Sequence, residues 1–200
     1  MCKFCFAKLY KKATRFKLIM LKYIARFLFK ITGWEIDPNP PENINKCVVA
    51  VGPHTSNWDF IIGKLAFVMY GVNAKFLIKK ELFFPPFGWF LKWAGGIPVN
   101  RKKNNQFTSK AISLFDKEES LYLVFTPEGT RKYNSKWKKG FYYIALKAKV
   151  PIYICYIDFS KKRGGFDSLF HPTGDVDKDI LEIKSVLKKY KGRFPKNGID

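Results

Sequence analysis

His54 and Asp59 are the two residues of this chain whose types and spacing best fit acid–base chemistry. His54 stands where a short apolar run gives way to a helical pattern, and the five-position spacing across such a turn allows the Asp59 carboxylate to reach the imidazole. A carboxylate bonded to one ring nitrogen fixes the tautomer and leaves the other nitrogen free to accept a proton. The pair would suit activation of a substrate hydroxyl. The alternative is an ordinary turn in which Thr55, Ser56 or Asn57 caps the helix.

A second polar turn follows a later apolar run and reads Glu128-Gly129-Thr130-Arg131. Glycine permits a backbone with positive φ and exposed N–H groups, and arginine offers paired contacts to phosphate. Arg101, which follows another short apolar run, is a third candidate ligand for an anion. Taken alone, each of these residues more often belongs to a solvated surface turn with an ordinary salt bridge than to a binding site.

The chain between these turns alternates between strand and helix patterns. Apolar runs predict strands at 46–52, 76–78, 95–101, 121–125 and 150–159. Apolar residues at helical spacing predict helices at 60–70, 106–119, 137–149 and 176–191. Such alternation predicts an α/β fold with a mixed, largely parallel sheet flanked by helices. Polar turns after the strands of such a sheet gather at one edge, so we expect the turns 53–59, 100–105 and 126–131 to lie together.

Four segments resemble the signature blocks of the glycerolipid acyltransferase family, which includes 1-acylglycerol-3-phosphate acyltransferase. His54-Thr-Ser-Asn-Trp-Asp59 resembles its H-x4-D block, and Gly96-Ile-Pro-Val-Asn-Arg101 is similar to its second block, a strand that ends in arginine. Phe125-Thr-Pro-Glu-Gly-Thr-Arg131 resembles the third block, and Val150-Pro151-Ile152 resembles the fourth. The blocks occur in the family's order between residues 47 and 158, so the resemblance covers more than half of the chain.

The resemblance implies transfer of an acyl chain from a thioester, either acyl-CoA or acyl carrier protein, to the hydroxyl of a lysophospholipid in phospholipid biosynthesis. It implies catalysis by His54 as general base with Asp59 as its partner. It also implies an acceptor site formed by Arg101, Glu128, Gly129, Thr130 and Arg131, without a metal or cofactor. We expect 1-acylglycerol-3-phosphate as the acceptor. Another lysolipid or an amino-acid lipid stays open, because Asn100 and Thr126 depart from the usual family pattern.

Residues 1–34 contain many Lys and Arg side chains and no acidic residue. On a helical wheel, residues 8–30 place most of these charges on one side and apolar side chains on the other, as in helices that lie in a membrane interface. The alternative is a helix packed on the domain with a solvated basic face. We divide the chain into a membrane-interface helix, residues 1–34, and an acyltransferase domain, residues 35–200.

The regular interruption of the apolar positions by charge argues against a secretory signal and against a membrane-spanning helix. We therefore expect a peripheral enzyme at the cytoplasmic face of the cell membrane. An aromatic stretch at 81–93 is expected either to belong to the core or to contact an acyl chain or lipid.

The net charge of +21, from 37 basic and 16 acidic residues, predicts an anionic partner. We expect this partner to be an anionic membrane surface and not nucleic acid, because the chain lacks zinc-finger spacing and an RNP-like strand. A non-catalytic membrane- or nucleic-acid-binding protein is the alternative of another class. Cys2 and Cys5 form a lone C-x-x-C without the further ligands that a zinc site would need.

Overall fold

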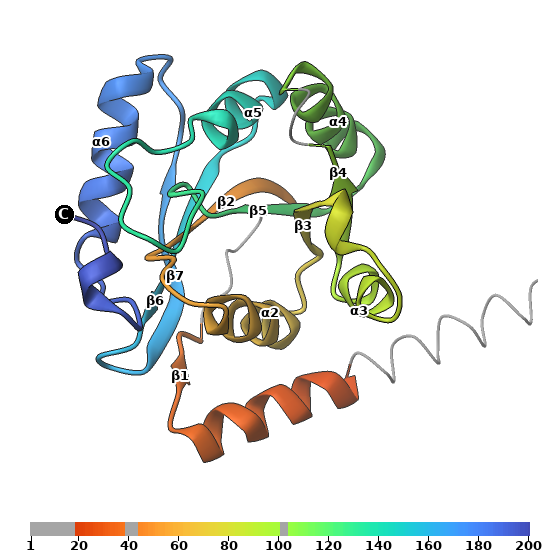
Figure 1. Cartoon of the computed structure of the whole chain (residues 1–200), viewed down its shortest axis with the longest axis vertical. Coiled ribbons are helices and arrows are strands. Elements are labelled where there is room, and N and C mark those ends of the chain that lie inside the picture. The colour runs from red at the N-terminus through yellow and green to blue at the C-terminus, as the bar shows by residue number, and fades with distance from the viewer. Residues whose placement is uncertain (1–18, 39–43, 101–103) are drawn as a thin grey trace, which may run out of the picture.

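The computed structural model describes residues 19–38, 44–100 and 104–200. Within these ranges, seven strands form one sheet in the order β1-β7-β6-β2-β5-β3-β4 (Figure 1). Neighbouring strands are parallel except β6 and β7, which are antiparallel. The predicted α/β fold with a mixed, largely parallel sheet is confirmed. The strands are β1 (Glu35–Ile36), β2 (Lys46–Gly52), β3 (Ala74–Lys79), β4 (Gly96–Val99), β5 (Leu121–Phe125), β6 (Ile152–Asp158) and β7 (Arg163–Phe170).

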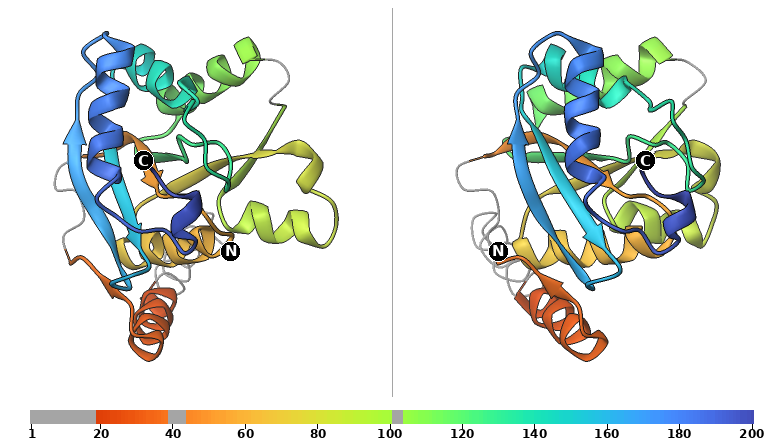
Figure 2. Two further views of the ribbon diagram at one scale, coloured as in Figure 1. Left: turned by 60° about the vertical axis from the view of Figure 1, so that its left-hand side comes forward. Right: turned by 90° about the vertical axis from the view of Figure 1, so that its left-hand side faces the viewer.

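Helices cover both faces of this sheet (Figures 1 and 2). One face carries α4 (Asn104–Lys117), α5 (Gly140–Ala148) and α6 (Val176–Leu187), and α6 is shorter than the predicted helix 176–191. The other face carries α2 (Trp58–Tyr70), α3 (Phe87–Trp93) and a helix at residues 19–32. Two short 3-10 helices complete the described secondary structure: η1 (Lys80–Leu82) and η2 (Pro195–Asn197).

The two helical layers exist because side chains on successive residues of a strand point to opposite faces. In β2, Val48 and Ala50 belong to the core under α4, α5 and α6. Cys47, Val49 and Val51, between and beside them, belong to the core under α2. Helices cover both faces of the central strands, so successive side chains of these strands are all buried. This explains the near-continuous apolar runs in the sequence.

A buried polar cluster joins α5 to α6 on the first of these faces. The hydroxyl of Tyr142, a fully buried side chain, donates to Asp179 Oδ2 at 2.6 Å and accepts the N–H of Gly174 at 2.9 Å. Asp179 also accepts hydrogen bonds from the N–H and the hydroxyl of Thr173, at 2.7 and 2.8 Å. The Tyr142 hydroxyl therefore supplies a hydrogen-bond donor to the Asp179 carboxylate, which is buried away from solvent.

We expect Tyr142→Phe to lower the free energy of unfolding by about 1–3 kcal/mol, because it leaves the buried Asp179 carboxylate short of a donor. Urea denaturation measures this change. Tyr143→Phe is the matched control, because Tyr143 is exposed and its hydroxyl makes no hydrogen bond to any described residue. Equal effects of the two substitutions would contradict the assigned role of the cluster.

Candidate functional site

The candidate site begins at the carboxyl end of β2, in the centre of the sheet. Residues 53–57 form the turn that leads from β2 into α2. β5 pairs in parallel with β2, so the turn after β5 emerges at the same edge of the sheet. The fold thus brings together two of the three predicted turns, 53–59 and 126–131.

His54 and Asp59 are in contact, as their spacing predicts. His54 Nδ1 lies 3.0 Å from Asp59 Oδ2. The Asp59 side chain is 4% exposed, whereas 21% of the His54 side chain is open to solvent. A carboxylate oxygen only accepts hydrogen bonds, so the Nδ1 proton belongs to this contact and Nε2 is the nitrogen left to accept a proton.

Asp59 also holds the backbone of the turn in place. The same Oδ2 atom accepts the N–H groups of Thr55, at 2.8 Å, and Ser56, at 2.9 Å. Asn57 occupies the N-cap position of α2 but makes no capping hydrogen bond, while Ser56 Oγ accepts the N–H of Trp58 at 3.2 Å. Ordinary helix capping therefore coexists with the His54–Asp59 contact and does not replace it.

Glu128 lies behind His54 and is 2% exposed. Its Oε1 accepts the backbone N–H of His54 at 2.7 Å, so it ties the second turn to the first. Burial raises the pKa of Glu128 to about 7; the His54 N–H opposes this rise and the negative charge of Asp59 adds to it. This position makes Glu128 a support for the His54 backbone, and the predicted contact of Glu128 with an acceptor stays a prediction.

The remaining residues of the second turn are more open. Gly129 has φ of 70°, the left-handed conformation that favours glycine, and its N–H donates to the Thr126 carbonyl at 3.0 Å. Thr130 is exposed, and its hydroxyl accepts the N–H of Lys132 at 3.3 Å. Arg131 donates from Nη1 to Asn57 Oδ1, which places a guanidinium group at the His54–Asp59 turn.

Arg101, the third predicted anion ligand, lies outside the described residues. β4, the strand that precedes it, ends at Val99. Its contribution to the site stays a prediction from the sequence.

A C-terminal segment packs against the turn that contains His54 and Asp59, and the sequence did not predict this contact. Phe194 donates its N–H to Thr55 Oγ1 at 3.2 Å, and a Cβ atom on Gly192 would lie 2.6 Å from Thr55 Oγ1. Between them, the Arg193 guanidinium lies 5.5 Å from the centre of the Trp58 ring. No local pattern signals this contact, because 139 positions separate Phe194 from Thr55.

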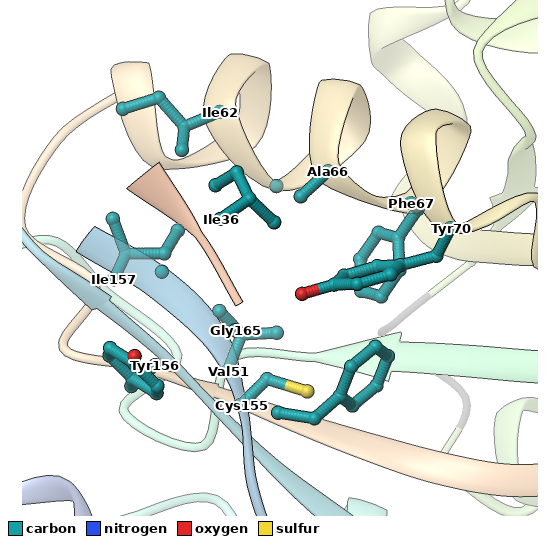
Figure 3. A pocket seen from close by; sticks show the side chains of 13 residues that line it. Ile36, Val51, Ile62, Ala66, Phe67, Tyr70, Cys155, Tyr156, Ile157 and Gly165 are labelled. Atoms are coloured by element: carbon teal, nitrogen blue, oxygen red, sulfur yellow. The ribbon is translucent and has the colours of Figure 1, made fainter. Parts of the chain in front are cut away.

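A small cavity of about 30 Å³ lies between α2 and the strands β6 and β7 (Figure 3). A cavity of this size has room for only a few water molecules and is too small for an acyl chain. Its lining is mostly apolar and does not include His54, Asp59 or Glu128; it comprises Ile36, Val51, Ile62, Gly63, Ala66, Phe67, Tyr70, Cys155, Tyr156, Ile157, Gly164, Gly165 and Phe166. Among the residues that the structure describes, no group of three His, Cys, Asp or Glu side chains is arranged to hold a metal ion.

The known proteins to which this chain is similar are acyltransferases. The model of the acyltransferase family matches residues 35–158. The chain is 32% identical over 163 residues to an uncharacterised acyltransferase of Schizosaccharomyces pombe, which covers 76% of this chain and 53% of that protein. It is 33% identical over 117 residues to the 1-acyl-sn-glycerol-3-phosphate acyltransferase of Streptococcus pneumoniae, which covers 58% of this chain and 41% of that protein.

A human relative, 1-acyl-sn-glycerol-3-phosphate acyltransferase beta, is 29% identical over 157 residues, which is 73% of this chain and 53% of that protein. The chain thus spans about half the length of the curated relatives it matches. The crystal structure of the 1-acyl-sn-glycerophosphate acyltransferase PlsC from Thermotoga maritima has the same fold. That structure aligns with a TM-score of 0.63 at 18% identity and covers 90% of this chain and 80% of its own.

Glu128→Gln removes the ionisable group but keeps an oxygen that can accept the His54 N–H. The pKa of Glu128 in the folded chain, about 7, is above its ordinary value of 4.5, so protonation of this side chain favours folding. That stabilisation is complete below pH 4.5 and is lost as the pH rises through 7. We therefore expect the stability of the variant, relative to the unsubstituted chain, to rise by roughly 3 kcal/mol between these limits.

Urea denaturation at a series of pH values measures this difference. Glu182→Gln is the control, because it makes the same change of side chain at an exposed position on α6. A pH-independent difference for Glu128→Gln would show that Glu128 does not titrate in this range.

Proposed function

The chain belongs to the acyltransferase family, and we propose that it transfers a fatty acyl chain from a thioester donor to the hydroxyl of a lysophospholipid. The proposed donor is acyl-CoA or acyl carrier protein. The proposed acceptor is 1-acylglycerol-3-phosphate, because two relatives are named as acyltransferases of that compound. The observation that carries the proposal is the 3.0 Å contact between His54 Nδ1 and Asp59 Oδ2.

In the proposed reaction, His54 Nε2 takes the proton of the acceptor hydroxyl as the oxygen attacks the thioester carbonyl carbon. The tetrahedral intermediate then collapses and the carbon–sulfur bond breaks. The leaving thiolate takes the proton back from the imidazolium, so the products are an ester and a thiol. Asp59 stabilises the imidazolium between the two proton transfers and keeps the ring oriented.

The cysteines in the described part of the chain support direct transfer between the two substrates. Cys47 and Cys155 are buried, and burial raises the pKa of both thiols, so neither is a ready nucleophile. Ser56 lies close to His54 but is 6% exposed, and its hydroxyl accepts the Trp58 N–H. We therefore propose that the acyl chain passes to the acceptor without a covalent acyl-enzyme.

The proposed acceptor site is the open part of the second turn. Arg131 is held at the catalytic turn by Asn57, and its guanidinium suits the phosphate of 1-acylglycerol-3-phosphate. Gly129, Thr130 and Arg101 are proposed to complete this site. An acceptor without phosphate, such as an amino-acid lipid, would make less use of the arginines.

We further propose that the enzyme acts at an anionic membrane, at the cytoplasmic face of the cell. In the helix at 19–32, Ala25 and Phe29 are buried against the domain, as the packed-helix alternative expects. Leu21 and Leu28 are half-buried, and six further large side chains of this helix are exposed: Ile19, Met20, Tyr23, Ile24, Phe27 and Ile31. Exposed apolar side chains on a strongly basic protein favour attachment to the surface of an anionic bilayer.

The aromatic stretch at 81–93 gives a second apolar surface on the same side of the sheet (Figure 1). Four of its rings follow one another with centroids 5.9–6.3 Å apart: Phe84, Phe87, Phe90 and Trp93. All four are exposed, and Trp89 is 69% exposed, so these rings are not part of the core. Exposed Trp and Phe side chains are favoured at the membrane–water interface.

No helix in residues 19–38, 44–100 or 104–200 has the length and apolar character needed to cross a membrane.

We expect wild-type protein on anionic vesicles to form a diacyl product when it receives acyl-CoA or acyl carrier protein donors and 1-acylglycerol-3-phosphate. His54→Ala should lower the rate by at least about 100-fold, because it removes the general base. Mass spectrometry of the lipids measures the product. His171→Ala is the matched control, because His171 is the other histidine of the chain and is exposed.

Product from another lysolipid or an amino-acid lipid alone would keep the chemistry and replace the acceptor. Equal rates for His54→Ala and wild type would rule out His54 as the base. Absence of product from any pair, in protein that is folded and bound to vesicles, would favour a non-catalytic membrane-binding protein.

The membrane proposal predicts that Trp89→Ser weakens binding to anionic vesicles by about tenfold, because a large apolar side chain no longer enters the interface. Leu181→Ser is the control, because Leu181 is 66% exposed on α6, on the opposite face of the sheet. Vesicle flotation measures both affinities. Equal binding by the two variants would show that the aromatic surface does not contact lipid.

A further inference from the structure

The C-terminal segment, residues 188–200, runs along the edge of the sheet that carries the catalytic turn (Figure 2). The carbonyl of Lys191 accepts the N–H of Phe159, directly after β6, at 2.8 Å. At the far end, Asp200 receives a hydrogen bond from Tyr133, in the loop that follows the second turn. Lys184 Nζ donates to the same carboxylate at 3.0 Å. The segment is therefore anchored on both sides of the site.

Between these anchors, the segment packs directly on the turn that contains His54. Thr55 is 3% exposed and accepts the N–H of Phe194 at 3.2 Å. Gly192 approaches Thr55 so closely that a Cβ atom would lie 2.6 Å from Thr55 Oγ1 and Cγ2. Arg193 lies between Gly192 and Phe194, so its backbone is fixed next to Thr55, which follows His54 in the sequence.

The Arg193 side chain is held by aromatic rings and not by a carboxylate. Its guanidinium lies 5.5 Å from the centre of the Trp58 ring and 5.8 Å from that of Phe194, within the range of cation–π attraction. In the described part of the chain, no acidic side chain forms an ion pair with Arg193. The charge is therefore oriented by rings while its hydrogen-bond donors stay available.

Two consecutive residues, Asn57 at the end of the turn and Trp58 at the start of α2, thus each hold an arginine from a distant segment. Asn57 holds Arg131 through a hydrogen bond, and Trp58 holds Arg193 through its ring. Asn57 and Trp58 are the last two residues before Asp59, which is bonded to His54. A pair of guanidinium groups suits the oxygens of one phosphate group, because each can donate two parallel hydrogen bonds.

We propose that Arg193 is a substrate-binding residue which, together with Arg131, binds a phosphate group of a substrate at the catalytic turn. This inference rests on the proposed acyl transfer. It adds a residue outside the segment 35–158 that matches the family model. The phosphate can belong to the acceptor lipid or to the CoA part of the donor, and the experiment separates these two sources.

The test compares Arg193→Gln with Lys191→Gln, which removes the same charge from an exposed side chain two residues away. We expect Arg193→Gln to raise the KM of one phosphate-bearing substrate by about tenfold with little change in kcat. Lys191→Gln should change either KM less than twofold. Equal changes in the two variants, or unchanged KM values in Arg193→Gln, would overturn the proposal.

The source of the phosphate follows from substrates that lack it. If Arg193 binds the acceptor phosphate, the effect of Arg193→Gln persists with acyl-pantetheine as donor and disappears with monoacylglycerol as acceptor. If it binds CoA, the effect disappears with acyl-pantetheine and persists with monoacylglycerol. An effect that persists with both analogues would show that Arg193 binds neither phosphate.

Direct binding separates this inference from the proposed function. Isothermal titration with glycerol 3-phosphate and with CoA needs no turnover. About tenfold weaker binding of one of them to Arg193→Gln, but not to Lys191→Gln, would support the inference even if no acyl transfer were found. Equal binding to all three proteins, or no binding to the wild-type protein, would overturn it while a positive transfer assay left the proposed function in place.

Discussion

One oxygen of Asp59 accepts three hydrogen bonds, and the geometry of the whole site depends on it. Asp59 Oδ2 receives the N–H groups of Thr55 and Ser56 together with Nδ1 of His54. The same atom therefore shapes the turn between β2 and α2 and selects the tautomer of the imidazole. Because the carboxylate is nearly buried, these donors replace water around Oδ2, whereas Oδ1 has no hydrogen-bond partner among the described residues. The orientation of the imidazole and the folding of the turn thus have a common physical cause.

Glu128 extends this arrangement to the second turn. It holds the His54 backbone from behind, so His54 is fixed by Asp59 through its ring and by Glu128 through its N–H. Two acidic side chains close together in a buried region do not both ionise readily. The raised pKa of Glu128 reflects this, with burial as the larger cause and the charge of Asp59 as an additional one. Protonation of Glu128 therefore lowers the negative charge beside His54 from that of two carboxylates to that of one.

The surface around the site is organised by charge and by exposed apolar groups. Arg131 and Arg193 come to the catalytic turn from two different segments, held by a side-chain amide and by an aromatic ring. The exposed rings of α3 and the exposed apolar side chains of the helix at 19–32 lie on the α2 side of the sheet. The arginines suit the phosphate of a lysophospholipid, and the exposed apolar side chains suit the lipid phase that holds its acyl chain. The presence of both kinds of surface supports the proposed lipid substrate.

The sequence by itself determined the central strands, the fold class, the family and the contact between His54 and Asp59, because these depend on near neighbours and on apolar runs buried on both faces. Only the tertiary structure decided what depends on distant contacts. β7 contains Gly164, Gly165 and Asp167 and has no continuous apolar run, so its strand forms because β6 supplies an antiparallel partner. Glu128 is a support behind His54 because β2 and β5 are neighbours, and Arg193 reaches Trp58 because the chain returns to the sheet edge after α6.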